Sequence, residues 1–129
     1  MSPHFFAYII HIFELIETID AFLSEDETGL KDSKTYMAIL YAVQTLSESA
    51  CKLPQDIKEC YPNVPWKDFL KMRNAIAHDY LGNVFREDIL KFIENEIPLL
   101  QSAMEQHLPN WKELRSRFEA NNVNGDCPN

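Results

Sequence analysis

The residues best suited to chemistry lie in one short stretch of the chain. Arg73, Asn74, His78 and Tyr80 place a permanent cation, a carboxamide, an imidazole and a phenol within eight positions. On an α-helix, which turns 100° per residue, these four side chains would occupy one side over about 160° of arc. The spacing therefore predicts a polar site along one helix rather than four unrelated surface groups.

Each group has a plausible chemical task. A guanidinium presents a planar fork of donors that fits a phosphate, and a histidine side chain exchanges a proton near neutral pH. We expect Arg73 to stabilise a phosphorane-like transition state, His78 to transfer a proton and Asn74 to orient a reacting group. Tyr80 could donate a hydrogen bond or accept a covalent group. This set suits cleavage of RNA by its own 2′-hydroxyl, although an Arg–His pair on a helix is more often structural.

The segment from Pro65 to Gly82 resembles the signature of HepT-like proteins in the HEPN superfamily. That signature is Arg, four residues, His, one residue, Tyr, with Asn after the Arg and Pro-Trp upstream. Arg73, His78 and Tyr80 hold its three named positions. The likeness extends over residues 10–102, and residues 46–50 are similar to the family's second helix, with Ser47 where glycine is usual.

The resemblance implies an all-α fold, an up-down four- to five-helix bundle of the HEPN type. The length of 129 residues predicts a single domain, placed over residues 1–120, and the Asn-rich composition of residues 121–129 predicts a flexible tail. The implied activity is that of a toxin in a toxin–antitoxin pair, a metal-independent endoribonuclease that uses Arg73, His78 and Asn74. The chain would form a homodimer with the motif at the interface. Its partner would be a minimal nucleotidyltransferase that neutralises it by transferring AMP to Tyr80, and no cofactor or metal is implied.

The overall charge limits how such a protein could hold RNA. The 129 residues carry a formal net charge of −8, whereas a general nucleic-acid binder has a basic face. Lys67, Lys71 and Arg73 form the only locally basic stretch, offset by Asp68. We therefore expect any RNA contact to be local.

The cysteines and the apolar N-terminus indicate in which cellular compartment the protein is expected to act. Cys51, Cys60 and Cys127 are odd in number and lack CxxC spacing, which favours reduced thiols in a cytoplasm and argues against a zinc site. Acidic residues interrupt the apolar stretch 4–22 well short of the roughly 20 residues that a membrane span needs. That stretch is therefore expected to be a core helix.

The remaining elements are expected to position the motif. Helical spacing predicts helices over residues 4–22, 33–53, 65–80, 85–106 and 111–118, and a short turn or helix over 56–61. Trp66 is expected to anchor the third helix, which would stop near Gly82, and Pro98 to kink the fourth. Glu48 would either orient Arg73 or lie at the surface.

Two alternatives remain open from the sequence. The chain could be a non-catalytic binding subunit for a nucleotidyltransferase, with Tyr80 or its pocket contacting nucleotide. It could also be a helical dimer whose polar motif only specifies the interface.

Overall fold

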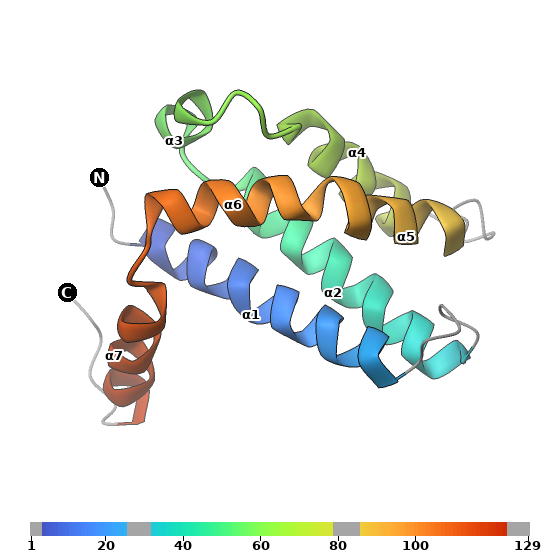
Figure 1. The fold of residues 1–129 in the computed structure, drawn as a ribbon, viewed down its shortest axis with the longest axis horizontal. Coiled ribbons are helices and arrows are strands. Elements are labelled where there is room, and N and C mark those ends of the chain that lie inside the picture. The colour runs from blue at the N-terminus through green and yellow to red at the C-terminus, as the bar shows by residue number, and fades with distance from the viewer. Residues whose placement is uncertain (1–3, 26–31, 79–85, 124–129) are drawn as a thin grey trace.

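The computed structural model describes residues 4–25, 32–78 and 86–123, and these residues form seven helices and no strand (Figure 1). The predicted all-α fold is confirmed. The helices have the bounds α1 His4–Glu25, α2 Ser33–Cys51, α3 Gln55–Cys60, α4 Trp66–Ala77, α5 Arg86–Asn95, α6 Ile97–His107 and α7 Trp111–Val123.

Helices α1 and α2 pack along one another, and the later helices α4, α6 and α7 each contact one of these two (Figure 1). Asp32 caps α2 because its carboxylate accepts a hydrogen bond from the Thr35 amide at 3.0 Å, which satisfies one of the free donors of the first turn. Farther along, the hydroxyl of Ser49 lies 3.1 Å from Nδ1 of His11 and links the two helices. Helix α4 packs on the other side of α2.

The segment between α2 and α4 is short and tightly held. The predicted short turn or helix over residues 56–61 is a helix, α3, which spans Gln55–Cys60. The indole N–H of Trp66 donates to the carbonyls of Lys58 and Tyr61 at 3.2 and 3.0 Å. The predicted anchoring of α4 by Trp66 is therefore confirmed, and it fixes where α4 begins.

Helix α4 is shorter than the sequence predicts. It ends at Ala77, with His78 as its C-cap, rather than continuing to Tyr80. The amide of His78 still donates to the carbonyl of Asn74 at 3.0 Å, so the helical hydrogen-bond pattern includes His78, the last residue described in this segment. The predicted stop near Gly82 falls outside the described residues.

The predicted fourth helix is two helices rather than one kinked helix. α5 ends at Asn95, α6 begins at Ile97, and Pro98 occupies the first turn of α6. Proline is favourable there because the first helical N–H groups have no partner in the helix. Pro98 therefore starts a helix instead of bending one, and α5 and α6 follow one another along the bundle (Figure 1).

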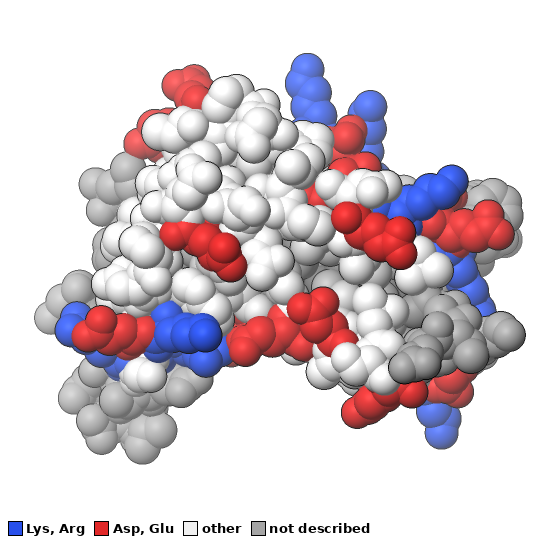
Figure 2. All heavy atoms as spheres, in the orientation of Figure 1, with Lys and Arg blue, Asp and Glu red and all other residues white. Residues whose placement is uncertain are grey.

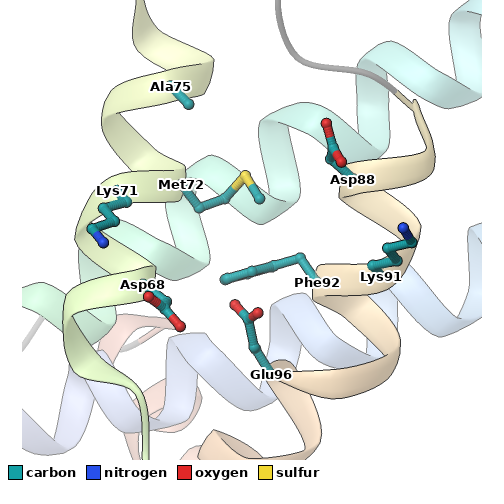
Figure 3. A pocket seen from close by; sticks show the side chains of 8 residues that line it. All are labelled: Asp68, Lys71, Met72, Ala75, Asp88, Lys91, Phe92 and Glu96. Carbon is teal, nitrogen blue, oxygen red and sulfur yellow. The ribbon is translucent and has the colours of Figure 1, made fainter.

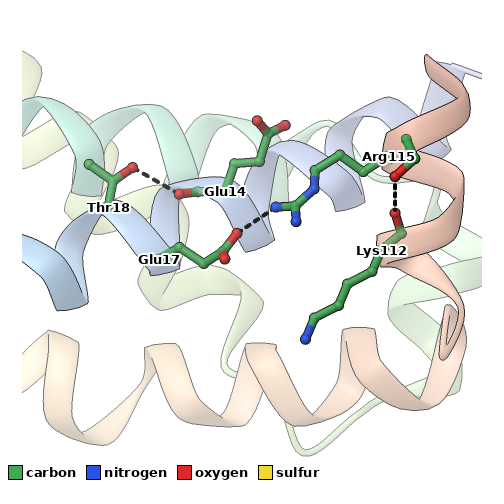
Figure 4. A network of polar contacts seen from close by, with 6 residues as sticks. Glu14, Glu17, Thr18, Lys112 and Arg115 are labelled. Atoms are coloured by element: carbon green, nitrogen blue, oxygen red, sulfur yellow. Dashed lines mark hydrogen bonds and ion pairs between the residues drawn. The ribbon is translucent and has the colours of Figure 1, made fainter. Parts of the chain in front are cut away.

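Helix α7 runs past the predicted end at Phe118 to Val123. Its first residue, Trp111, stacks on Phe13 of α1 with ring centroids 4.2 Å apart. Arg115 lies over the Trp111 ring and pairs with Glu17 of α1 at 2.7 Å (Figure 4). These contacts hold the start of α7 against α1.

The core is one continuous apolar cluster to which α1, α2, α3, α4, α5 and α6 contribute. Its largest fully buried side chains are Ile9, Ile12, Phe13, Ile19, Ile39, Leu46, Ile57, Phe69, Ile89, Leu100 and Met104. Phe69 supplies the α4 contribution and meets Phe92 edge-on at 5.0 Å. Burying this face of α4 turns the polar residues of its opposite face outward. In the described residues no helix is long and apolar enough to cross a bilayer.

Candidate active site

Arg73 lies on α4, partly buried against the end of α2. Its charge and that of Lys58 both lower the pKa of the Cys51 thiol at the end of α2, so the guanidinium is within electrostatic range of that thiol. Among the described residues Arg73 forms no ion pair and no side-chain hydrogen bond. A cation held beside a helix without a partner is available to an anionic ligand.

Asn74 and His78 are both exposed, one turn apart at the end of α4. Neither side chain has a hydrogen-bond partner among the residues that the structure describes. Five residues on a helix correspond to about 7.5 Å of rise and about 140° of rotation, so Arg73 and His78 are near neighbours that face different directions. The structure thus brings three of the four predicted site residues to one end of α4.

The predictions for Tyr80 and Glu48 have different outcomes: the first is not tested by the described residues, and the second is. Tyr80 lies outside the described residues. Glu48 is partly buried near Cys51, and within the described part of the chain it forms no ion pair with Arg73. Glu48 is therefore close to the motif without fixing the guanidinium through a direct pair.

A pocket of about 640 Å³ opens beside the first half of α4. Its lining includes Cys51 from α2, Lys58 from α3 and Trp66, Lys67 and Leu70 from α4. Burial raises the pKa of the Cys51 thiol, and the charges of Lys58 and Arg73 oppose that rise. The thiol is thus a neutral part of the pocket wall.

A second pocket, of about 440 Å³, lies between α4 and α5 (Figure 3). Met72 and Phe92 point into the space between the two helices, and the carboxylates of Asp68 and Glu96 point toward one another (Figure 3). Burial and the charge of Asp68 raise the pKa of Glu96. No motif residue lines this pocket.

The surface charge agrees with a local rather than a general contact to nucleic acid. Figure 2 shows acidic and basic side chains interspersed on the face that it draws, around uncharged areas. Over the described ranges no three His, Cys, Asp or Glu side chains are grouped so that they could hold a metal ion.

The pocket beside Trp66 was not predicted from the sequence. It depends on the turn at Pro54, which folds α3 back beside the end of α2 and brings Lys58 to α4. The bond from Lys58 Nζ to the carbonyl of Cys51 at 2.8 Å maintains that arrangement. A lysine seven residues after the last residue of a helix gives no periodic signal by which to find it.

The fold and the site together define a small helical bundle of the HEPN type with a polar motif at the end of one helix. The chain belongs to the ribonuclease HepT-like family, whose model matches residues 9–107. It is similar to a protein of Thermococcus cleftensis named "Probable ribonuclease HepT", with 33% identity over 101 residues that cover 77% of this chain and 91% of that protein.

Two other relatives have similar names. One, from Methanocaldococcus jannaschii, is named as a putative RNase and is 33% identical over 95 residues, which cover 71% of this chain and 77% of that protein. The other, from Caldanaerobacter subterraneus subsp. tengcongensis, is also named as a putative RNase and is 31% identical over 112 residues, which cover 81% and 95% of the two chains. No solved structure matches the chain.

Proposed function

We propose that this protein is a metal-independent endoribonuclease in which Arg73 and His78 act on one phosphodiester, with Asn74 in support. The main observation behind the proposal is that the side chains of Arg73 and His78 are unpaired within the described part of the chain. Among the described residues neither the guanidinium nor the imidazole has a protein partner, and His78 is exposed. A purely structural pair would be expected to use these groups in ion pairs or hydrogen bonds. Membership of a ribonuclease family supports the same activity.

The reaction is an internal transfer. The 2′-oxygen of one nucleotide bonds to the phosphorus while the bond from phosphorus to the 5′-oxygen of the next nucleotide breaks. The 2′-hydroxyl loses its proton to a base and the 5′-oxygen gains one from an acid, leaving a 2′,3′-cyclic phosphate and a 5′-hydroxyl. His78 serves the proton transfers, and Arg73 stabilises the added negative charge on the phosphoryl oxygens.

A homodimer with the motif at its interface fits this chemistry. One imidazole cannot act as base and acid in the same step, whereas two copies of the motif in one cleft supply both. On α2, the side chains of Met37 and Tyr41 are 68% and 70% exposed. Large exposed apolar side chains are typical of interaction surfaces, and one self-complementary patch is enough for a two-fold dimer.

The regulatory part of the proposal rests on the family resemblance. The protein acts in the cytoplasm as the toxin of a toxin–antitoxin pair, and a minimal nucleotidyltransferase inactivates it by transferring AMP from ATP to the oxygen of Tyr80, releasing pyrophosphate. Intact-mass spectrometry after incubation with that enzyme and ATP would show added AMP, absent in Tyr80→Phe. An unchanged mass for the wild-type chain would contradict this part.

The ribonuclease assignment is tested by the chemistry of the products. With EDTA present, the protein should cut a single-stranded RNA and leave 2′,3′-cyclic phosphate ends, detectable by mass spectrometry. An RNA with 2′-methoxy groups at all positions should remain intact because the attacking hydroxyl is blocked. Cleavage of the methylated RNA, or cleavage that needs added metal, would contradict the mechanism.

The net charge of −8 fits a second function, that of a non-catalytic binding subunit for a nucleotidyltransferase. Addition of AMP to Tyr80 without any cleavage of RNA by the free protein would favour this alternative.

A further inference from the structure

We propose that the pocket between α3 and the start of α4 is a nucleobase-binding subsite, which takes a base of the RNA strand next to the phosphate at Arg73. This inference rests on the proposed ribonuclease function and adds the part of the substrate that the pocket would recognise. No motif residue lines the pocket, so it is a separate site on the same helix.

The position of the pocket along α4 links it to the motif. Leu70, at the pocket wall, is one turn before Asn74, and Asn74 is one turn before His78. Residues four apart lie one above the other on a helix, so these three side chains form a continuous row from the pocket to the motif. Arg73 is only three residues from Leu70, about 4.5 Å along the axis. A strand bound at Arg73 could therefore reach the pocket with an adjacent nucleotide.

The walls suit a flat, uncharged ring. Val64, Pro65, Trp66 and Leu70 supply apolar surface, and aromatic side chains commonly stack on the bases of single-stranded nucleic acids. Trp66 does not have to be ordered on binding, because its indole N–H is already held by two carbonyls. The volume of about 640 Å³ lies in the range of small-molecule pockets, about 300 to 1,000 Å³.

The charges assign base and phosphate to different places. Two cations, Lys58 and Lys67, and two acids, Glu59 and Asp68, line the pocket, so its lining has no net formal charge. Arg73, just beyond it, is an unpaired cation among the described residues. A phosphate is favoured at Arg73 and a neutral base in the pocket. The amide of Gln55, also in the lining, provides a donor and an acceptor for the edge of a base.

The first experiment uses the intrinsic fluorescence of Trp66. The chain has two tryptophans, and Trp111→Phe keeps an aromatic ring against Phe13 while leaving Trp66 as the one tryptophan, which is excited selectively over the tyrosines. This protein is titrated with a 2′-methoxy trinucleotide, which cannot be cleaved, and with an abasic trinucleotide of equal charge. The normal trinucleotide should quench Trp66 and bind about ten-fold more tightly, the effect of about one stacked base. Equal affinities, or no change in emission, would overturn the proposal.

A matched pair of variants provides the second measurement. Leu70 and Leu99 are 44% and 40% exposed leucines, but only Leu70 lines the pocket. Leu70→Ser should weaken binding of the trinucleotide several-fold, whereas Leu99→Ser should leave it unchanged. Equal effects of the two variants, with helical circular dichroism intact in both, would also overturn the subsite.

The outcomes separate the two proposals. If wild type cleaves RNA but does not distinguish the abasic trinucleotide, the ribonuclease assignment stands and the subsite fails. If the base quenches Trp66 but no RNA is cleaved, the pocket binds a base and the ribonuclease assignment fails.

Discussion

Replacing Ser47 with alanine should stabilise the protein, although the change removes a polar group from a helix next to the motif. Ser47 is fully buried in α2, and its hydroxyl has no hydrogen-bond partner among the described residues. A buried hydroxyl without a partner costs about 1–3 kcal/mol. Alanine removes that cost and has a helix propensity better by about 0.5 kcal/mol, while the missing oxygen leaves a void smaller than a methyl group.

The expected net gain in the free energy of unfolding is about 1 kcal/mol, which corresponds to a rise of about 4 °C in Tm for a chain of this size. Ser49→Ala is the matched control. Ser49 is two residues away in the same helix and 4% exposed, but its hydroxyl is bonded to Nδ1 of His11 at 3.1 Å. Removing that hydroxyl should cost about 1 kcal/mol, so the two variants should change stability in opposite directions.

The assay is urea unfolding followed by circular dichroism at the helical band, since a shift in midpoint at constant slope reports a change in stability. A loss of stability in Ser47→Ala equal to that in Ser49→Ala would refute the reasoning. It would mean that the Ser47 hydroxyl makes an interaction that the geometry does not show.

Three further predictions concern the elements around the site. Trp66→Phe removes the indole donor shared by two carbonyls and should destabilise the fold by about 1–2 kcal/mol in urea unfolding; an unchanged midpoint would contradict the anchoring role. The pKa of Glu96 is raised by burial and by Asp68, so its ionised form disfavours the folded state. That penalty is absent below the ordinary glutamate pKa of 4.5, grows as the pH rises through the raised value and is complete above it. Glu96→Gln should therefore increase the free energy of unfolding at pH 7 by less than about 1 kcal/mol, because solvent screens the group, and this gain should be seen as a small rise in Tm. The rise should vanish near pH 4. The control Glu94→Gln should change Tm at neither pH. Arg115→Ala removes both the pair with Glu17 (27% and 55% exposed) and the cation over Trp111 and should cost about 1–2 kcal/mol. Salt screens the ion pair, so the loss of Tm should be smaller in high salt, and a larger loss in high salt would contradict the role of the pair.

The sequence predicts the parts of the fold that periodicity and capping control. The predicted start of the second helix at residue 33 agrees with α2, and the Pro-Trp pair places the start of α4 within one residue. The prediction of one kinked helix over residues 85–106 was wrong because a proline such as Pro98 has two possible effects on a helix. It disrupts a continuous helix, but it is favourable in the first turn of a new one, and only the packing on either side of Glu96 decides between them.

The candidate site was predicted in its residues but only partly in its geometry. Helical spacing describes Arg73 and Asn74 well, whereas His78 ends the helix as its C-cap. The role of Tyr80 stays a prediction, because that residue lies outside the described part of the chain. The pocket at Trp66 could not be found from spacing, since it combines residues from α2, α3 and α4 that only the tertiary fold brings together.

The measurement that tests the central claim most directly is the cleavage rate of a short single-stranded RNA in EDTA by four proteins: wild type, Arg73→Ala, His78→Ala and the control Lys71→Ala. Lys71 is an exposed cation on the same helix, so its loss tests whether general charge matters. The proposed chemistry predicts that Arg73→Ala and His78→Ala each lose activity by about a hundred-fold or more, while Lys71→Ala stays within a few-fold of wild type. Unchanged cleavage by folded Arg73→Ala and His78→Ala proteins would contradict the account.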